Sequence, residues 1–561
     1  MKKLHCILFL FLSAFVSISA QKQAKDTVVT RNVTVEREYV PVVKNAGKVT
    51  LAPQTVEPKD IKTEAVYTEF NLPLPVEASI HTLPAARLSL SDRNAKKGFA
   101  RIGIGSYPNA LADFAYPLVN NADALLDFTL RHRGTFGYEL YSKTAANLQF
   151  DKKFDALNFF TGITGGHDYF RYYGKQFDAE TLENRANQDS ISDTNTFLKT
   201  GIYAGILSAE EPYEWHYRAK AGYDLFNIAN TVSENTIGIT GGLSGAYDDD
   251  RIGGDIELYN MVYTVNPNTT NLWNNYAVLM LNPYYDLQRS DNWSLRLGFK
   301  AAFSFLHGNT VNPLPDIRFN WNIVPEWVDF YGGLTGDYKV NTINTIFAEN
   351  PYLSLDMQVA DTYTPFEFYG GFNIKPFDNM MVNVFANFRY IDNQYFFVNK
   401  EQFFSTPPAA LPEDSIFSNR FDVIYTKATH FKAGIRANYN YQNRLNIQFK
   451  GAYNGWDMYN GDAYAWNKPV WEADFNANFN VTKELAFSLN AFYEGERYAK
   501  LGDSIRTMSP KIDVNLGASY TYLDWLTFFA KANNLLNNRY EKFYGYQVQG
   551  LNVMVGAAMS F

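Results

Sequence analysis

Polar and apolar residues alternate with a period of two along most of the chain. In residues 513–522 apolar side chains occupy every second position, and polar or small side chains fall between them. The last segment, 551–561, alternates in the same way and ends on Phe561. Successive side chains of a strand point to opposite faces, so this pattern predicts strands with one apolar face and one polar face.

Two architectures have such strands. In a soluble β-sandwich the apolar face packs on a second sheet, whereas in an outer-membrane barrel it meets lipid and the polar face lines the interior. A chain that ends within a strand favours the barrel, because closure pairs the last strand with the first. Lys432 and Arg436 share one face of their segment, and Lys450 lies on the polar face of the next. A lipid-facing Lys or Arg costs about 2–4 kcal/mol at mid-depth, so this face is assigned to the lumen.

Two kinds of connection alternate from Gly98 to the end of the chain. Short ones lie near 120–121, 151–153, 210–212, 248–250, 289–291, 324–326, 376–378, 442–443, 482–483 and 523–524. Long polar ones lie near 174–196, 341–363, 399–419, 457–468, 499–509 and 534–548. Short periplasmic turns that alternate with long external loops are typical of outer-membrane barrels. Ten turns, with both barrel ends on the same side, predict an all-β antiparallel barrel of about 22 strands, within a range of about 18–22.

The first 97 residues have a different composition. Lys2 and Lys3 precede an apolar run and Ser19-Ala20, which predicts a signal peptide over 1–20 because the run is too short for a membrane anchor. Residues 21–97 are rich in Val, Thr, Pro, Lys and Glu, and their prolines interrupt any long element. We expect them to form an extended periplasmic extension or a reduced plug, followed by the outer-membrane barrel over 98–561.

Composition supports a barrel and restricts the partners. Aromatic residues make up 16% of the 561 residues, as girdles at both membrane interfaces require. The net charge of −8 argues against a nucleic-acid partner. The sole cysteine, Cys6, lies in the leader, so the mature chain has no disulfide. A periplasmic-side girdle is assigned to Tyr213, Trp215, Trp293, Trp321, Trp327, Tyr441, Tyr522 and Trp525.

The sequence shows no catalytic motif. The histidines of the mature chain are scattered, without metal-ligand spacing, so we expect no enzyme, cofactor or metal site. One loop combines aromatic rings with carboxylates, which suits flat amphipathic ligands such as sugars. Packing within the outer girdle is the alternative for the same rings. The candidate ligand residues are Trp456, Asp457, Tyr459, Asp462, Tyr464 and Trp466.

The carboxyl end resembles that of TonB-dependent outer-membrane receptors. The resemblance lies in Asn533–Tyr540, in Gly545, Gly550 and Gly556, and in the terminal Phe561. It implies a 22-stranded barrel in the outer membrane of a Gram-negative bacterium, with Phe561 as the signal for the barrel-assembly machinery. The segment Asp26, Thr27, Val28, Val29 and Thr30 resembles the energy-coupling box of the family, which implies TonB as a partner bound by strand addition.

The chain departs from this family in its amino-terminal part. The family carries a plug domain considerably longer than residues 21–97, and a barrel of this size needs a filled lumen. Residues 21–97 can fill it as a reduced plug, the external loops can fold inward, or another protein can occupy it. Three functions follow: uptake of a nutrient of unknown identity, a structural or assembly subunit of an outer-membrane complex, and a passive diffusion channel.

Overall fold

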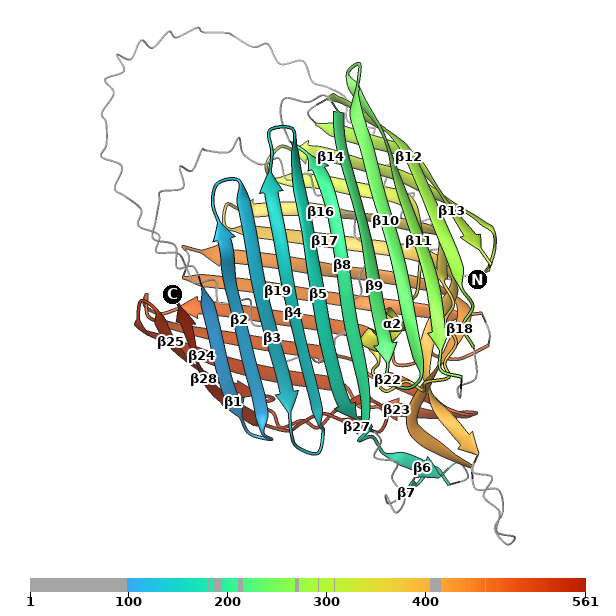
Figure 1. The fold of residues 1–561 in the computed structure, drawn as a ribbon, viewed down its shortest axis with the longest axis vertical. Helices are drawn as coiled ribbons and strands as arrows, with labels where there is room; N and C mark the ends of the chain where they lie inside the picture. The colour runs from blue at the N-terminus through green and yellow to red at the C-terminus, as the bar shows by residue number, and fades with distance from the viewer. Residues whose placement is uncertain are drawn as a thin grey trace, which may run out of the picture. The chain divides into compact units, whose positions relative to one another are not determined.

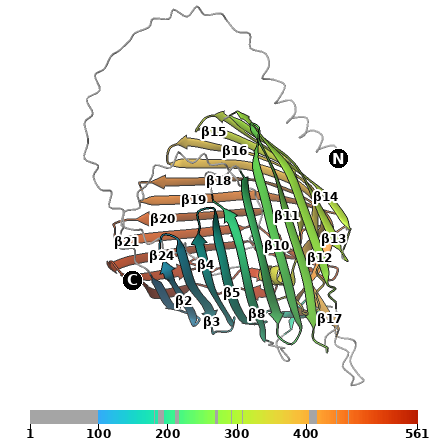
Figure 2. The same ribbon diagram turned by 45° about the horizontal axis from the view of Figure 1, so that its top comes forward.

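The protein is an antiparallel β-barrel in which 22 strands close on themselves (Figures 1 and 2). We describe a computed structural model. The predicted leader, the 21–97 extension with Asp26–Thr30, and Tyr213 lie outside the residues that it describes. The described residues are 98–178, 181–185, 194–209, 215–267, 272–290, 292–306, 308–403, 415–442, 444–459 and 461–561.

The barrel strands follow one another around the sheet in chain order. The first eleven are β1 (Phe99–Gly105), β2 (Asn109–Asn120), β3 (Ala124–Thr135), β4 (Tyr141–Lys153), β5 (Leu157–Arg171), β8 (Thr194–Ser208), β9 (Trp215–Ile228), β10 (Val232–Tyr247), β11 (Asp250–Val265), β12 (Tyr276–Ser290) and β13 (Trp293–Phe305). The others are β14 (Val311–Val324), β15 (Val328–Lys339), β16 (Thr362–Phe377), β17 (Met380–Phe403), β18 (Ser415–Tyr441), β19 (Leu445–Met458), β20 (Trp471–Asn480), β21 (Leu485–Glu494), β24 (Lys511–Leu523), β25 (Leu526–Asn533) and β28 (Asn552–Ser560).

The barrel closes where β1 pairs antiparallel with β28. Beyond this ladder the amide of Gly98 donates to the carbonyl of Phe561 over 2.6 Å, and the amide of Phe561 donates to the carbonyl of Gly98 over 3.0 Å. The expected pairing of the last strand with the first is therefore confirmed, as is the expected strand number of 22.

The predicted short turns lie between consecutive barrel strands, except that residues 210–212, 291 and 443 fall outside the described residues. At the opposite end of the barrel, the predicted bounds of the loop over 399–419 are wrong. Strands β17 and β18 stay paired through Phe403 and from Ser415 onward, so their hairpin forms an arm longer than the neighbouring strands. The pairing continues because β6 (Gln176–Asp178) adds to the edge of β18 and supplies further backbone hydrogen bonds. β6 also pairs with β7 (Asn184–Arg185) (Figure 1).

The two faces of the barrel have the predicted chemistry. Arg436 pairs across strands with Lys450, and Lys450 pairs with Asp474, so charged residues form one row on the luminal face. On the outward face of β1, Ile102 and Ile104 are 64% and 72% exposed, as lipid contact requires. At the turn end, the girdle tryptophans of β13 and β14 are cross-strand partners. Among the described residues, no helix is long and apolar enough to cross a membrane.

Besides β6 and β7, the described residues form three short elements in the loops opposite the turns. They are the helix α2 (Ile343–Glu349), the hairpin of β22 (Arg497–Leu501) and β23 (Ser504–Met508), and the hairpin of β26 (Glu541–Phe543) and β27 (Tyr546–Gln547). Helix α2 and the strand ends around it form a buried aromatic cluster. The apolar core of this barrel thus gathers at its loop-bearing end.

Candidate functional site: a lid and the charged cavity beneath it

Residues 340–361, which we call the lid, join β15 to β16 and fold inward across the barrel mouth. Asp361 fixes the base of the lid, because its carboxylate accepts hydrogen bonds from the hydroxyls of Tyr276 and Tyr338, each over 3.0 Å. The same carboxylate accepts from the backbone amide of Asn341 over 3.0 Å. Both ends of the lid are therefore held together at one point of the barrel wall.

Helix α2 begins at a reciprocal capping box between Thr342 and Thr345. Its first free amides meet Glu234 of β10, whose carboxylate accepts from Ile343 over 2.6 Å and from Asn344 over 3.3 Å. The predicted long loop at 341–363 is thus in the right place, but the helix in it was missed. The local signal is the Thr342–Thr345 pair followed by apolar residues at helical spacing, which the structure buries as Ile343, Ile346 and Phe347.

Aromatic packing holds the lid against both sides of the barrel. Phe347 lies against Phe197 of β8, with ring centroids 4.9 Å apart. On the other side, the amide of Ser354 donates to the carbonyl of Phe421 over 2.7 Å, and the amide of Phe421 donates to the carbonyl of Tyr352 over 3.0 Å. The lid thus spans the mouth from β8 to β18. Of the three ways to fill the lumen that the sequence left open, inward-folded loops are present.

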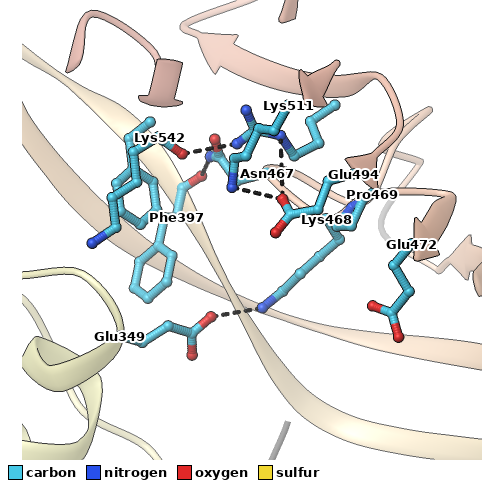
Figure 3. Close-up of a pocket in the computed structure, with 11 residues that line it drawn as sticks. Glu349, Phe397, Asn467, Lys468, Pro469, Glu472, Glu494, Lys511 and Lys542 are labelled. Carbon is cyan, nitrogen blue, oxygen red and sulfur yellow. Dashed lines mark hydrogen bonds and ion pairs between the residues drawn. The ribbon is translucent and has the colours of Figure 1, made fainter. Parts of the chain in front are cut away.

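A small cavity lies beside the carboxyl end of α2 (Figure 3). Its volume is about 40 Å³, which is enough for a water molecule or a small ion. Four cationic side chains and three carboxylates line it together with other residues from the barrel wall and loops. The lining residues are Glu349, Phe397, Asn467, Lys468, Pro469, Glu472, Glu494, Arg497, Lys511, Lys542 and Phe543.

The carboxylates of the cavity are bound by ammonium groups. Lys468 Nζ lies 2.8 Å from Glu349 Oε1, and Lys511 Nζ lies 2.6 Å from Glu494 Oε2 (Figure 3). Lys468 belongs to the β19–β20 loop, whereas Glu349 is the last residue of α2. The Lys468–Glu349 pair therefore links the lid directly to the barrel.

Glu349 is charged in this setting despite its burial. Burial by itself raises the pKa of this carboxyl, but the charge and hydrogen bond of Lys468, the hydroxyl of Tyr395 and the charge of Lys339 together hold the pKa below its ordinary value. Lys468 and Lys339 also lie over the ring of Tyr395, at 5.8 Å and 5.5 Å from its centroid. The lid carboxylate is thus surrounded by positive charge.

Two buried polar atoms at the cavity lack a hydrogen-bond partner among the described residues. The guanidinium of Arg497 donates to the carbonyls of Lys542 and Glu541, but its Nε–H has no acceptor. Asn467 donates from Nδ2 to the carbonyl of Phe397 over 2.8 Å, and its Oδ1 has no donor. One free donor and one free acceptor at the same cavity suit a small polar occupant.

The predicted ligand loop borders the cavity without lining it. Trp466 is only 1% exposed and donates from Nε1 to Asp462 over 3.0 Å. Tyr464 stacks on Tyr498 of β22, with ring centroids 3.7 Å apart. These contacts resemble the packing alternative, and the cavity is lined by the next residues along the chain, 467–469.

Of the other three residues of that prediction, Trp456 packs against the same buried cluster as Trp466. Trp456 stacks on His430 at 3.9 Å between ring centroids, while Asp457 and Tyr459 are exposed. Tyr459 contacts Tyr390 edge to face. A ligand role for this loop stays a prediction.

Comparison with known proteins yields likeness in structure alone. No protein-family model matches the chain, and no curated protein matches it in sequence. Solved structures match the barrel over most of its length. The ferripyoverdine receptor of the outer membrane of Pseudomonas aeruginosa is 10% identical, with a TM-score of 0.60 over 84% of this chain and 72% of that one.

Two further matches are a siderophore receptor and a copper transporter. The siderophore receptor PirA from Acinetobacter baumannii is 11% identical, with a TM-score of 0.62 over 84% of this chain and 81% of that one. The copper transporter OprC is 12% identical, with a TM-score of 0.60 over the same shares of the two chains. The barrel fold expected from the carboxyl-terminal motif is confirmed, and this chain has the barrel fold of these receptors and this transporter.

Proposed function

We propose that the protein takes up a nutrient ligand across the outer membrane of a Gram-negative bacterium. The observation that carries the proposal is the lid. The barrel is closed and its lumen is charged, and the lid crosses its mouth with a cavity beneath. A diffusion channel needs no such closure, whereas a receptor that admits one ligand does. The similar structures include a siderophore receptor and a copper transporter, which agrees with uptake.

The segment before the barrel fits a role in energy coupling. Residues 21–97 contain 12 Lys and Arg against 9 Asp and Glu, so their formal charge is +3. With Lys2 and Lys3 in the leader, the chain total of −8 leaves −13 for residues 98–561. A basic segment joined to an acidic barrel favours its placement in the lumen as a reduced plug. Asp26–Thr30 is then the strand that TonB takes up.

Growth of the producing bacterium tests the proposal. A strain that lacks the gene is grown with single nutrients limiting in turn, and is complemented with the full chain or with a chain that keeps the leader but lacks residues 21–97. We expect a growth defect for one nutrient class, restored by the full chain alone. Full restoration by the shortened chain would exclude energy coupling through residues 21–97, and growth without any defect would exclude uptake.

The arm formed by β17, β18, β6 and β7 favours a second function. This arm continues past the ends of the neighbouring strands (Figure 1). Extended strand edges are surfaces to which other chains add, so the arm fits a structural or assembly subunit of an outer-membrane complex. Gentle detergent extraction tests it: a stoichiometric partner that is lost when the arm is shortened supports this function, and a barrel that purifies alone excludes it.

A further inference from the structure

We propose that Glu349 occupies, in the closed lid, the position of an anionic group of the ligand, and that a ligand carrying carboxylate or phosphate displaces Glu349 from Lys468 and releases the lid. The inference rests on the proposed uptake function and adds to it a substrate class and an opening mechanism. It follows from the way in which the charges of the cavity are divided between the lid and the barrel.

All the cations of the cavity belong to the barrel and its other loops. Lys468, Arg497, Lys511 and Lys542 lie outside the lid, and so do Glu472 and Glu494. Glu349 is the only one of the lining residues that the lid contributes. When the lid leaves, four lining cations therefore face two lining carboxylates instead of three.

The remaining carboxylates already have cationic partners. Glu494 lies 2.6 Å from Lys511 Nζ and 3.9 Å from Arg497 Nε. Glu472 lies 2.6 Å from Lys432 Nζ and 3.7 Å from Lys450 Nζ. Lid opening thus withdraws one negative charge from a partly desolvated site that four cations line, which is costly unless an anion enters.

Glu349 and the cavity beside it are surrounded by groups that bind carboxylate and phosphate. Arg497 is 1% exposed and keeps one Nε–H without an acceptor, so it has a donor available for an anion. The hydroxyl of Tyr395 donates to Glu349, and the Lys468 side chain is 7% exposed. A multivalent anion presents several oxygens to these donors, whereas Glu349 presents two.

Displacement of Glu349 opens the lid because anion binding and lid opening are thermodynamically linked. The anion and Glu349 compete for the same cations, so the anion binds the open state more tightly than the closed one and shifts the population towards it. The closed lid in turn excludes ligands that lack such a group, because they supply no replacement for Glu349.

The lid offers a matched control at a second ion pair. Asp356 pairs with Lys400 of β17, but neither residue lines the cavity. The Asp356 side chain is 55% exposed, so solvent screens this pair. Asp356→Asn removes a lid–barrel charge pair away from the cavity, whereas Glu349→Gln removes the one at the cavity.

Cysteine labelling reports the lid position without any need for transport. Ile346 of α2 is 0% exposed, and the sole native cysteine, Cys6, lies in the predicted leader. The full mature chain with Ile346→Cys is purified in detergent, and its rate of maleimide labelling is measured in chloride, citrate or inorganic phosphate at equal ionic strength. Leu353→Cys, also 0% exposed, is the second reporter in case the first variant does not fold.

We expect citrate or phosphate to accelerate labelling roughly tenfold over chloride. Glu349→Gln labels fast in chloride and gains nothing from either anion, while Asp356→Asn behaves like the parent. Equal rates in all three salts overturn the inference, and so does an Asp356→Asn variant that labels as fast as Glu349→Gln. If labelling responds but no nutrient defect exists, the proposed function fails alone. If the defect exists but labelling does not respond, this inference fails alone.

Discussion

Tyr352 of the lid lies flat on Tyr546 of the β25–β28 loop, with ring centroids 3.7 Å apart and 20° between the ring planes. Tyr546 is 0% exposed, and its hydroxyl donates to the carbonyl of Asn419 on β18. Two loops that are distant in sequence therefore meet over the lumen, and a strand end supports the contact. The next lid residue, Leu353, forms an isolated parallel β-bridge with Phe421, so the stack and the bridge hold the same side of the lid closed.

Loss of this stack is expected to open the mouth of the barrel. Tyr352→Ala removes a ring contact worth about 0.5–1.5 kcal/mol beyond its buried area. In the full mature chain with Ile346→Cys, we expect Tyr352→Ala to raise the rate of maleimide labelling about 2- to 10-fold over the parent. Tyr352→Phe keeps the ring and is the control, with a labelling rate near that of the parent. Labelling of Tyr352→Ala at the parent's rate would show that the stack does not hold the lid.

The Glu234 cap on α2 gives a second prediction. Glu234→Ala leaves the amides of Ile343 and Asn344 without their acceptor, at a cost of about 1–3 kcal/mol. Hydrogen exchange should show the protection factors of α2 amides falling by roughly tenfold or more. Glu257→Ala is the control, because that carboxylate accepts from Tyr259 on its own strand. Equal protection in both variants would contradict the capping role.

The barrel was predictable because each strand meets two different surroundings. A strand between lipid and a polar lumen must alternate, so Lys432, Arg436 and Lys450 fixed the inner face before any pairing was known. The arm was less predictable, because β17 and β18 extend beyond their neighbours only where β6, from a distant loop, pairs with β18. Sequence alternation marks the strands but does not say which strand another loop extends.

The cavity could not be predicted in the same way. Glu349 and Lys468 are 119 positions apart, and neither has a local signal that names the other. Helix α2 has only 7 residues, which are too few for a helical pattern of apolar residues to be recognised within a loop. The aromatic rings of the loop before Lys468 indicated a ligand site. In the structure Trp466 is buried, and Lys468, two positions later, lines the cavity.

The lid should loosen in acid. The pKa of Glu349 lies below its ordinary value of 4.5 in the folded state, since Lys468 and Tyr395 outweigh burial. A carboxyl with a depressed folded pKa stabilises the fold above its unfolded pKa, and this contribution is lost as pH falls through the folded value.

Hydrogen exchange across pH checks this expectation. Protection factors of α2 amides, which correct for intrinsic exchange, should fall as the pH drops below about 4.5 and through the folded pKa of Glu349. In Glu349→Gln the protection is lower at neutral pH and the acid-dependent loss is smaller, whereas Asp356→Asn keeps the parent's loss because solvent screens its pair with Lys400. A Glu349→Gln variant with the parent's full acid dependence would show that another group controls the lid.

Deletion of the terminal residue distinguishes an effect on barrel assembly from an effect on barrel stability. Phe561 contributes two backbone hydrogen bonds with Gly98 and a stacked contact with Tyr116 at 6.1 Å between ring centroids. Two such bonds are worth about 1–3 kcal/mol, a small part of the energy of a 22-strand barrel. A chain that lacks Phe561, refolded in detergent, should therefore melt close to the parent.

In cells the same deletion should act much more strongly, if Phe561 is the signal that the assembly machinery reads. We expect the deletion to lower the fraction of chain in the outer membrane that shows heat-modifiable gel mobility, with the remainder unfolded in the periplasm. Phe561→Trp keeps a terminal aromatic ring and serves as the control, with assembly near that of the parent. Equal losses in detergent and in cells would mean that Phe561 acts only as part of the seam between β1 and β28, because a structural contact weakens both barrels alike while a recognition signal affects only the one that must be assembled.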